Sequence, residues 1–273
     1  MFLLLVNFLF LTEVIRKTIV TLHLAMWAVG KLEQAVETCT SGCTAMDCYE
    51  ESVYSWDQAV AFYSGTNPGD KLPFHDADKY CKYFGTCGED RELMEGTAQV
   101  NHKLMDYFKE GQTSIVNGDC QSALQMKEQI EALMTVPNIQ GTLRNIWKGY
   151  ENMEKGEVHK VEKHRGEAIA YTAALLPLVH DCNAKDAEII HDYIFTADLD
   201  LDSYKAVKEA LERNYECMKV QCADVGGFTG KESDEYKDFH IPCNVQQASS
   251  SPNAVKLGFG IGVAVGVAVL SLL

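Results

Sequence analysis

Apolar positions recur every three or four residues along most of the chain between residues 31 and 248, which is the period of an amphipathic helix. The spacing is clearest in four stretches, which contain Val53, Trp56, Val60 and Tyr63; Val100, Leu104, Met105 and Phe108; Ile139, Leu143, Ile146, Trp147 and Tyr150; and Tyr204, Val207, Leu211, Tyr215 and Met218. Sustained alternation of apolar and polar residues, the mark of a strand, is absent from the sequence. The pattern predicts an all-α fold, a bundle of about six to eight helices separated by glycine, proline and asparagine.

The first part of the chain has the form of a secretory signal peptide. Arg16 and Lys17 precede an uncharged run, and Ala28-Val29-Gly30 fits a small-residue cleavage site. We therefore expect residues 1–30 to be removed, so that the mature chain begins at Lys31. Residues 1–15 form a further apolar run upstream, and an uncleaved signal anchor is the alternative.

The other end has the form of an anchor signal. Small residues at 248–251 are followed by a short polar segment and by an uncharged apolar run over residues 257–273. This order is typical of a tail that is exchanged for a glycolipid (GPI) anchor, so residues 249–273 are predicted to fix the protein to the plasma membrane. The four-residue spacing of Gly258, Gly262 and Gly266 leaves a transmembrane helix as the alternative.

All ten cysteines lie between Cys39 and Cys243, outside both ends. An even number of thiols in this region, with no Cys-x-x-Cys motif, predicts a disulfide-stapled helical ectodomain over residues 31–248. The protein is then expected on the cell surface, at the outer face of the plasma membrane, or in the periplasmic space. The spacing of Cys48, Cys81 and Cys87 recurs approximately at Cys182, Cys217 and Cys222, so a duplicated helical unit is possible; coincidence is an equal alternative.

The chain is acidic, with 24 Lys and Arg against 39 Asp and Glu and a formal net charge of −15. It has no basic cluster, which argues against nucleic acid as a partner and leaves cationic ligands or simple solubility. The motifs of serine hydrolases, nucleotide-binding loops and zinc proteases are absent from the sequence, so no enzyme activity is expected.

The most informative predicted helix covers about residues 157–179. On a helical wheel, His164, Glu167 and Tyr171 share one face with apolar residues. An imidazole, a carboxylate and a phenol on one face could supply three ligands to a metal ion. The alternative is a structural role, in which the buried histidine and tyrosine are satisfied by hydrogen bonds.

A second predicted helix, over residues 53–64, carries Asp57 and Tyr63. Their oxygen atoms are hard donors of the kind a ferric ion prefers. The alternatives are a solvated helix-terminal acid for Asp57 and a core aromatic residue for Tyr63. Acidic residues from Asp198 onward partly match a calcium-binding loop, but Ser203 stands where that loop needs glycine, so Asp202 or Ser203 is expected to be a helix N-cap.

Four ungapped segments, in this order over most of the predicted ectodomain, resemble the phytotransferrin family, the low-iron-inducible iron-assimilating surface proteins of algae. They are residues 56–65 (WDQAVAFYSG), 82–88 (KYFGTCG), 166–180 (GEAIAYTAALLPLVH) and 217–227 (CMKVQCADVGG). The resemblance implies a surface protein that captures Fe³⁺ with carbonate as a synergistic anion, and that delivers it for endocytic uptake through an unknown receptor or reductase. A weaker likeness to imelysin-type iron-uptake proteins comes from the His-x-x-Glu of His164 and Glu167, although Glu162 stands where that motif carries a glycine.

The resemblance implies the roles of several residues. His164 and Glu167 are iron ligands by the imelysin-like motif, and Asp57 and Tyr63 by the phytotransferrin-like segment. Tyr171 is added by the wheel alone, and Arg165 is expected to neutralise the bound carbonate. Protonation of His164, Glu167 or carbonate in an acidic endosome is expected to weaken the site.

Three other functions compete with iron capture. The main alternative is a disulfide-rich helical surface or adhesion protein that binds no metal. Loose binding of divalent cations by the acidic surface is a second, and an enzyme acting on carbonate species is a distant third, because no three-histidine metal pattern is present.

Overall fold

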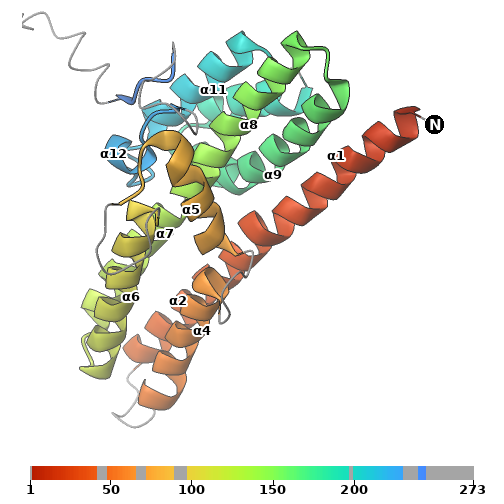
Figure 1. The fold of residues 1–273 in the computed structure, drawn as a ribbon. Helices are drawn as coiled ribbons and strands as arrows, with labels where there is room; N and C mark the ends of the chain where they lie inside the picture. The colour runs from red at the N-terminus through yellow and green to blue at the C-terminus, as the bar shows by residue number, and fades with distance from the viewer. Residues whose placement is uncertain are drawn as a thin grey trace, which may run out of the picture.

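The structure is a computed structural model, and it describes residues 2–41, 48–65, 72–88, 97–196, 199–229 and 239–243. These residues form helices (Figure 1). They also contain one isolated antiparallel bridge, between Cys87 and Ala98. The predicted all-α bundle is confirmed. The elements in chain order are α1 (Phe2–Thr18), the π-helical segment η1 (Ile19–Leu24), α2 (Ala25–Thr40), η2 (Cys48–Val53), α4 (Tyr54–Ser64), α5 (Pro73–Phe84), α6 (Gln99–Val116), α7 (Cys120–Met134), α8 (Val136–Glu154), α9 (Val158–Cys182), α10 (Ala184–His191), η3 (Asp192–Thr196), α11 (Leu201–Asn214) and α12 (Cys222–Val225).

The predicted ectodomain holds more than eight helices even within its described part. Two short helices account for the excess: α10 starts directly after α9, and α12 has four residues. Asn183 separates α9 from α10 because it leaves the helical conformation and its side chain accepts hydrogen bonds from the backbone N–H groups of Lys185 and Asp186. A break of one polar residue hardly changes the spacing of the apolar residues, so the sequence pattern does not separate the two helices.

Local signals fix several helix ends. Pro73 stands in the first turn of α5, and Gly85 ends it in the left-handed conformation, with φ of 65°. Asp200 is the N-cap of α11, since its side chain accepts from the backbone N–H of Ser203. The expectation that Asp202 or Ser203 is the cap is therefore wrong by two or three residues. Asp198, the first acidic residue of the suggested calcium loop, lies outside the described residues.

The N-terminal elements α1, η1 and α2 join end to end in one helical rod along one side of the molecule (Figure 1). Gly30, the expected cleavage position, lies inside α2. The later part of the rod is anchored by apolar residues that are fully or almost fully buried, namely Ala28, Leu32, Ala35 and Val36. The signal peptide over residues 1–30 stays a prediction, and the structure adds that residues 10–30 pack against the rest of the chain.

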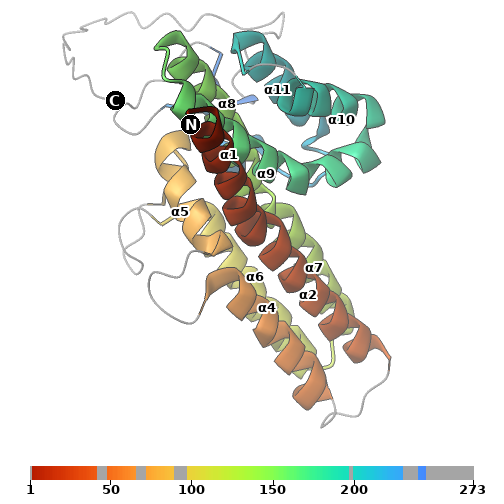
Figure 2. The same cartoon turned by 90° about the vertical axis from the view of Figure 1, so that its right-hand side faces the viewer.

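Helix α2 and the helices that follow it form two groups (Figure 2). Helices α2, α4, α6 and α7 pack around Trp56, Leu104 and Phe108, while α8 to α11 pack around Ile146, Leu175 and other apolar residues. Helix α5 contacts both groups, through α4 and α6 on one side and α8 on the other. Most residues of the predicted apolar stripes lie in this core, because the hydrophobic effect drives these faces out of water.

Four disulfides link the described residues: Cys39–Cys120, Cys81–Cys87, Cys182–Cys217 and Cys222–Cys243. The prediction of a disulfide-stapled bundle is confirmed. The pairing does not follow the suggested repeat, because Cys81 bonds Cys87 whereas the corresponding Cys217 and Cys222 bond other partners. Cys43 and the side chain of Cys48 lie outside the described residues.

Within the described ranges, no helix is both long enough and apolar enough to cross a membrane. The expected anchor signal over residues 249–273 lies outside these ranges.

Candidate cation site between α5 and α9

Helix α9 carries three of the predicted site residues on one side. Glu167 and Tyr171 are buried, and His164, one turn earlier, is partly exposed. The Nδ1 atom of His164 lies 2.9 Å from the side-chain oxygen of Asn145 on α8 and 3.6 Å from Oε2 of Glu167. The three side chains therefore follow one another along α9 where it packs on α8.

Helix α5 adds two residues that the sequence analysis missed, Asp76 and Tyr80. The hydroxyl of Tyr171 donates to Oδ2 of Asp76 over 2.8 Å, and the hydroxyl of Tyr80 donates to that of Tyr171 over 2.6 Å. Both tyrosines are fully buried, with their rings edge to face. A four-residue spacing puts Asp76 and Tyr80 on one face of α5, and this spacing is the signal that could have found them.

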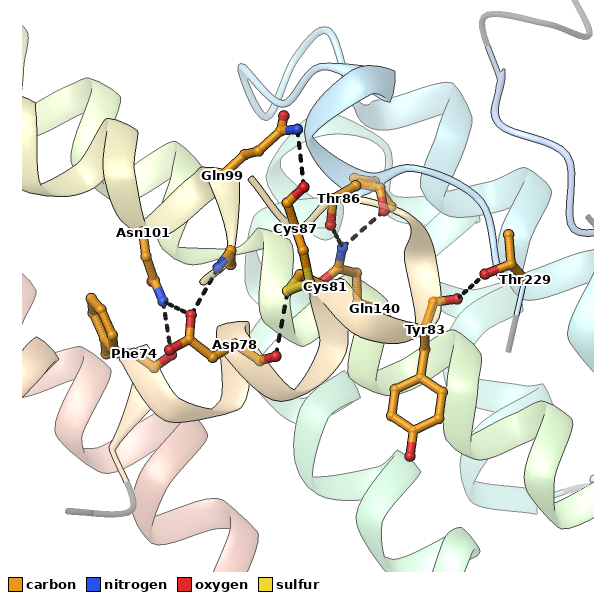
Figure 3. Close-up of a disulfide and its surroundings, with 12 residues drawn as sticks. Phe74, Asp78, Cys81, Tyr83, Thr86, Cys87, Gln99, Asn101, Gln140 and Thr229 are labelled. Atoms are coloured by element: carbon orange, nitrogen blue, oxygen red, sulfur yellow. Dashed lines mark hydrogen bonds between the residues drawn. A yellow bond between two sulfur atoms is a disulfide. The ribbon is translucent and has the colours of Figure 1, made fainter. Parts of the chain in front are cut away.

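The C-terminal end of α5 is held firmly, as Figure 3 shows. The Cys81–Cys87 disulfide closes the turn after the helix. The side-chain amide of Gln140, on α8, donates to Oγ1 of Thr86 over 3.1 Å and to the carbonyl of Val225 over 2.9 Å. These contacts fix α5 against α8 and so set the position of Asp76 and Tyr80 relative to α9.

Gly141 on α8 makes room for Tyr171. A Cβ atom at this position would lie 2.7 to 2.8 Å from three ring carbons of Tyr171, closer than real Cβ contacts. The absence of a side chain at Gly141 therefore lets the Tyr171 ring lie directly on the backbone of α8.

Two cations from α1 complete the cluster. The ammonium of Lys17 lies 2.8 Å from Oδ1 and 2.9 Å from Oδ2 of Asp76, and 5.2 Å from the centre of the Tyr171 ring. The guanidinium of Arg16 lies 3.3 Å from Oε1 of Glu167. Lys17 is 4% exposed, so its charge is stabilised by this carboxylate and ring rather than by water.

The charge of Glu167 is strongly stabilised. Burial raises the pKa of its carboxyl, but the His164 ring and the nearby ammonium groups of Lys79 and Lys17 outweigh burial and lower the pKa to about 2. Glu167 therefore stays ionised in a mildly acidic compartment. This is contrary to the expectation that its protonation there weakens the site.

The pKa shifts of the two phenols and of Lys79 favour their neutral forms. Burial raises the pKa of Tyr80 and of Tyr171 well above the usual value, and the charge of Asp76 adds to this effect. Burial also lowers the pKa of Lys79 to about 8, and Lys17 contributes to the shift. Both phenols are neutral in this arrangement, so they act as phenolate ligands only where a metal ion displaces their protons.

Asp57 and Tyr63 do not join the cluster. Asp57 is exposed and accepts from the side chain of Gln112 over 2.5 Å. Tyr63 is buried, donates to the side chain of Asn101 and packs edge-on against Phe74 of α5. Residues 74 and 78 of α5 face Tyr63, whereas residues 76 and 80 face Tyr171. Because two residues turn a helix by about 200°, the two tyrosines lie on opposite sides of α5.

An arginine that the sequence analysis did not name, Arg144, lies over the Tyr80 ring. The side chain of Arg165, the expected anion-binding residue, is partly exposed, and no hydrogen bond or ion pair joins its guanidinium to another described residue. The guanidinium of Arg144 lies 4.5 Å from the centre of the Tyr83 ring and 6.0 Å from that of Tyr80. Its Nε atom is buried and has no hydrogen-bond partner among the described residues.

Three surface hollows of about 420, 410 and 350 Å³ are lined by residues outside the cluster, for example Lys109, Lys127 and Trp27. In the part of the chain that the structure describes, no three His, Cys, Asp or Glu side chains converge as they would around a metal ion. The cluster differs in kind, since it combines the carboxylates of Asp76 and Glu167 with two phenols.

Comparisons of this chain with protein-family models, with curated proteins and with solved structures found no match. A functional interpretation therefore depends on the geometry of the cluster between α5 and α9, which brings carboxylate and phenol oxygens together around a buried positive charge.

Proposed function

We propose that this protein binds ferric iron at the cluster between α5 and α9 and captures it at the cell surface for uptake. One observation carries the proposal: Asp76 and Tyr171 are in direct contact beside a buried ammonium. This position already stabilises one positive charge out of water, and its carboxylate and phenol oxygens are the donors that a hard trivalent cation prefers.

Asp76 and Tyr171 are the central ligands in this proposal, and Tyr80 is the third. Fe³⁺ displaces the protons of the phenols, as metal ions do with acidic ligands. Glu167 and His164, on the preceding turns of α9, complete the donor set. Carbonate binds beside the metal as the synergistic anion, and Arg144, with its buried Nε and its position over the rings of Tyr80 and Tyr83, neutralises it in place of Arg165.

The setting supports surface capture. The disulfides require an oxidising compartment, which agrees with the predicted leader and anchor signal. Iron is carried inward by endocytosis through a partner receptor or reductase, with no enzymatic turnover. Release in an acidic compartment acts through His164 or carbonate, because Glu167 holds its charge at that pH.

The test uses the protein as a eukaryotic host secretes it, titrated with Fe³⁺ as its nitrilotriacetate complex, with and without bicarbonate. A visible tyrosinate-to-iron charge-transfer band is expected, stronger with bicarbonate. Tyr171→Phe should weaken the band, and the double variant Tyr80→Phe/Tyr171→Phe should abolish it, since both phenols are proposed ligands. Tyr63→Phe should retain the band, because this buried tyrosine lies on the opposite side of α5. Absence of the band, or its survival in the double variant, contradicts the proposal.

The second candidate function is a disulfide-rich helical surface or adhesion protein without a metal. It is favoured by the pairing inside the cluster, where Lys17 and Arg16 already neutralise the two carboxylates. Fe³⁺ should then leave the melting temperature unchanged, whereas a cation that binds only the native state raises it.

A further inference from the structure

We infer that residues 10–24 are an internal plug of the candidate cation site, and that the Lys17 ammonium holds the place of the bound cation until this segment leaves. The inference rests on the proposed function and adds its regulation. The plug spans the end of α1 and all of η1, and it lies across the bundle beside α5 and α9 (Figure 2).

The plug has its polar side inward. Between residues 10 and 24, the buried side chains are Lys17 and Thr21, whereas Leu11, Ile15 and Ile19 are exposed by 54%, 61% and 52%. A surface helix of a stable bundle normally shows the reverse, an apolar stripe inward and polar residues outward. Phe10, Val14, Val20, Leu22 and Leu24 of the plug are only partly buried. Helix α2, by contrast, buries four apolar side chains fully or almost fully, so the plug is expected to be displaced at a lower cost than α2.

The surface of α9 is shaped to receive the plug. A Cβ atom at Gly166 would lie 2.8 Å from the backbone oxygen of Phe10, so the two helices approach more closely than any other residue at position 166 allows. The hydroxyl of Thr21 lies 3.4 Å from the carbonyl of Ala170, one turn further along α9. The contact between α1 and α9 therefore depends on local features of both helices.

The plug and a metal ion exclude each other at Asp76. Both carboxylate oxygens of Asp76 lie within 2.9 Å of the Lys17 ammonium, so they are not free for a second cation. Binding of iron to this carboxylate requires displacement of Lys17, and the apparent affinity falls in proportion to the fraction of molecules in which the plug is out. Cleavage after Gly30, where the leader is expected to end, removes Lys17 and Arg16 together and leaves Asp76 and Glu167 without these partners.

The first test uses the full chain, produced in an oxidising cytosol so that residues 1–30 are retained. Lys17→Gln keeps a hydrogen-bond donor of similar reach and removes the charge. It should raise the apparent affinity for Fe³⁺, presented as its nitrilotriacetate complex with bicarbonate, by at least about tenfold. Lys31→Gln is the matched control, because Lys31 lies on the same rod and bonds only to Gln34 among the described residues.

A second variant tests the plug independently, in case Lys17→Gln does not fold. Gly166→Leu should push α1 off α9 while every proposed ligand stays in place, and it should raise the affinity as Lys17→Gln does. Hydrogen exchange provides a readout that needs no iron: amides of residues 10–24 should be protected in the parent chain and exchange faster in Gly166→Leu.

The outcomes separate the two proposals. Equal iron affinity in the parent chain and both variants overturns the plug and leaves the proposed function standing. Unprotected amides in residues 10–24 of the parent chain overturn the plug whatever the iron affinity. Absence of a charge-transfer band in every form overturns the proposed function, and the plug with it.

Discussion

At the scale of single residues, the arrangement of the cluster depends on which partner neutralises each buried charge. Removing a charged side chain from water is costly, and a close partner must offset that cost. Asp76 forms an ion pair with Lys17, while Glu167 contacts Arg16 and the His164 ring. These pairs neutralise both carboxylates next to the neutral phenols, and carboxylate and phenol oxygens are the donors that a hard trivalent cation prefers.

The low pKa of Glu167 predicts a stability change in acid. Its folded-state pKa of about 2 lies below the ordinary 4.5, so ionised Glu167 stabilises the fold above about pH 4.5, and this stabilisation is lost as pH falls from 4.5 towards 2. The shift corresponds to about 3 kcal/mol. We expect the free energy of unfolding to fall over this range in urea titrations, and to fall less in Glu167→Gln.

Glu157 provides the control for this prediction. Its carboxyl lies on the surface, bonded only to Lys160 among the described residues, so Glu157→Gln should leave the acid profile almost unchanged. Parallel acid profiles for the parent chain and Glu167→Gln would contradict the assignment.

At the scale of helices, the site depends on how closely α8 and α9 approach. The ring of Tyr171 lies against Gly141, so the backbone of α8 forms one wall of the cluster. Close packing of this kind leaves no room for an added methyl group without movement of the ring.

Gly141→Ala is therefore expected to destabilise the protein by about 1–3 kcal/mol, the usual cost of overpacking a core. Gly30→Ala is the matched control, because Gly30 is also helical and an added Cβ meets no atom within 4 Å. It should stabilise the protein by about 0.5–1 kcal/mol, since alanine favours a helix over glycine. Urea unfolding measures both, and equal stabilities would contradict the proposed contact.

At the scale of the whole molecule, disulfides join parts of the chain that are far apart in sequence. Cys39–Cys120 links α2 to α7 across 81 residues, whereas Cys81–Cys87 closes a turn across 6. The longer loop restricts the unfolded chain more, so it is expected to contribute more stability.

Replacing both cysteines of Cys39–Cys120 by alanine should lower the free energy of unfolding by about 4 kcal/mol, against about 2 kcal/mol for Cys81–Cys87. The measurement is urea unfolding of the two double variants under oxidising conditions. A larger loss for the short loop would show that Cys81–Cys87 acts mainly by positioning α5, as its place at the end of that helix allows.

The net charge of the whole molecule differs from the local charge of the cluster. The net charge of −15 spreads over the chain, but the cluster is balanced by two cations from the N-terminal rod. Loss of residues 1–30 would leave the cluster more negative than the chain as a whole suggests. This attracts cations at long range, whereas the choice of iron rests on the oxygen donors themselves.

The sequence by itself determined the all-α class, the disulfide framework and the shared face of His164, Glu167 and Tyr171, because these depend on local period and composition. Only the tertiary structure decided which helices meet. It put Tyr63 on the far side of α5, brought Asp76 and Tyr80 to Tyr171, and placed Lys17 beside Asp76 and the Tyr171 ring. The physical reason is that helix period fixes the direction of a side chain on its own helix, while its partners across the bundle depend on long-range packing and on how each buried charge is neutralised.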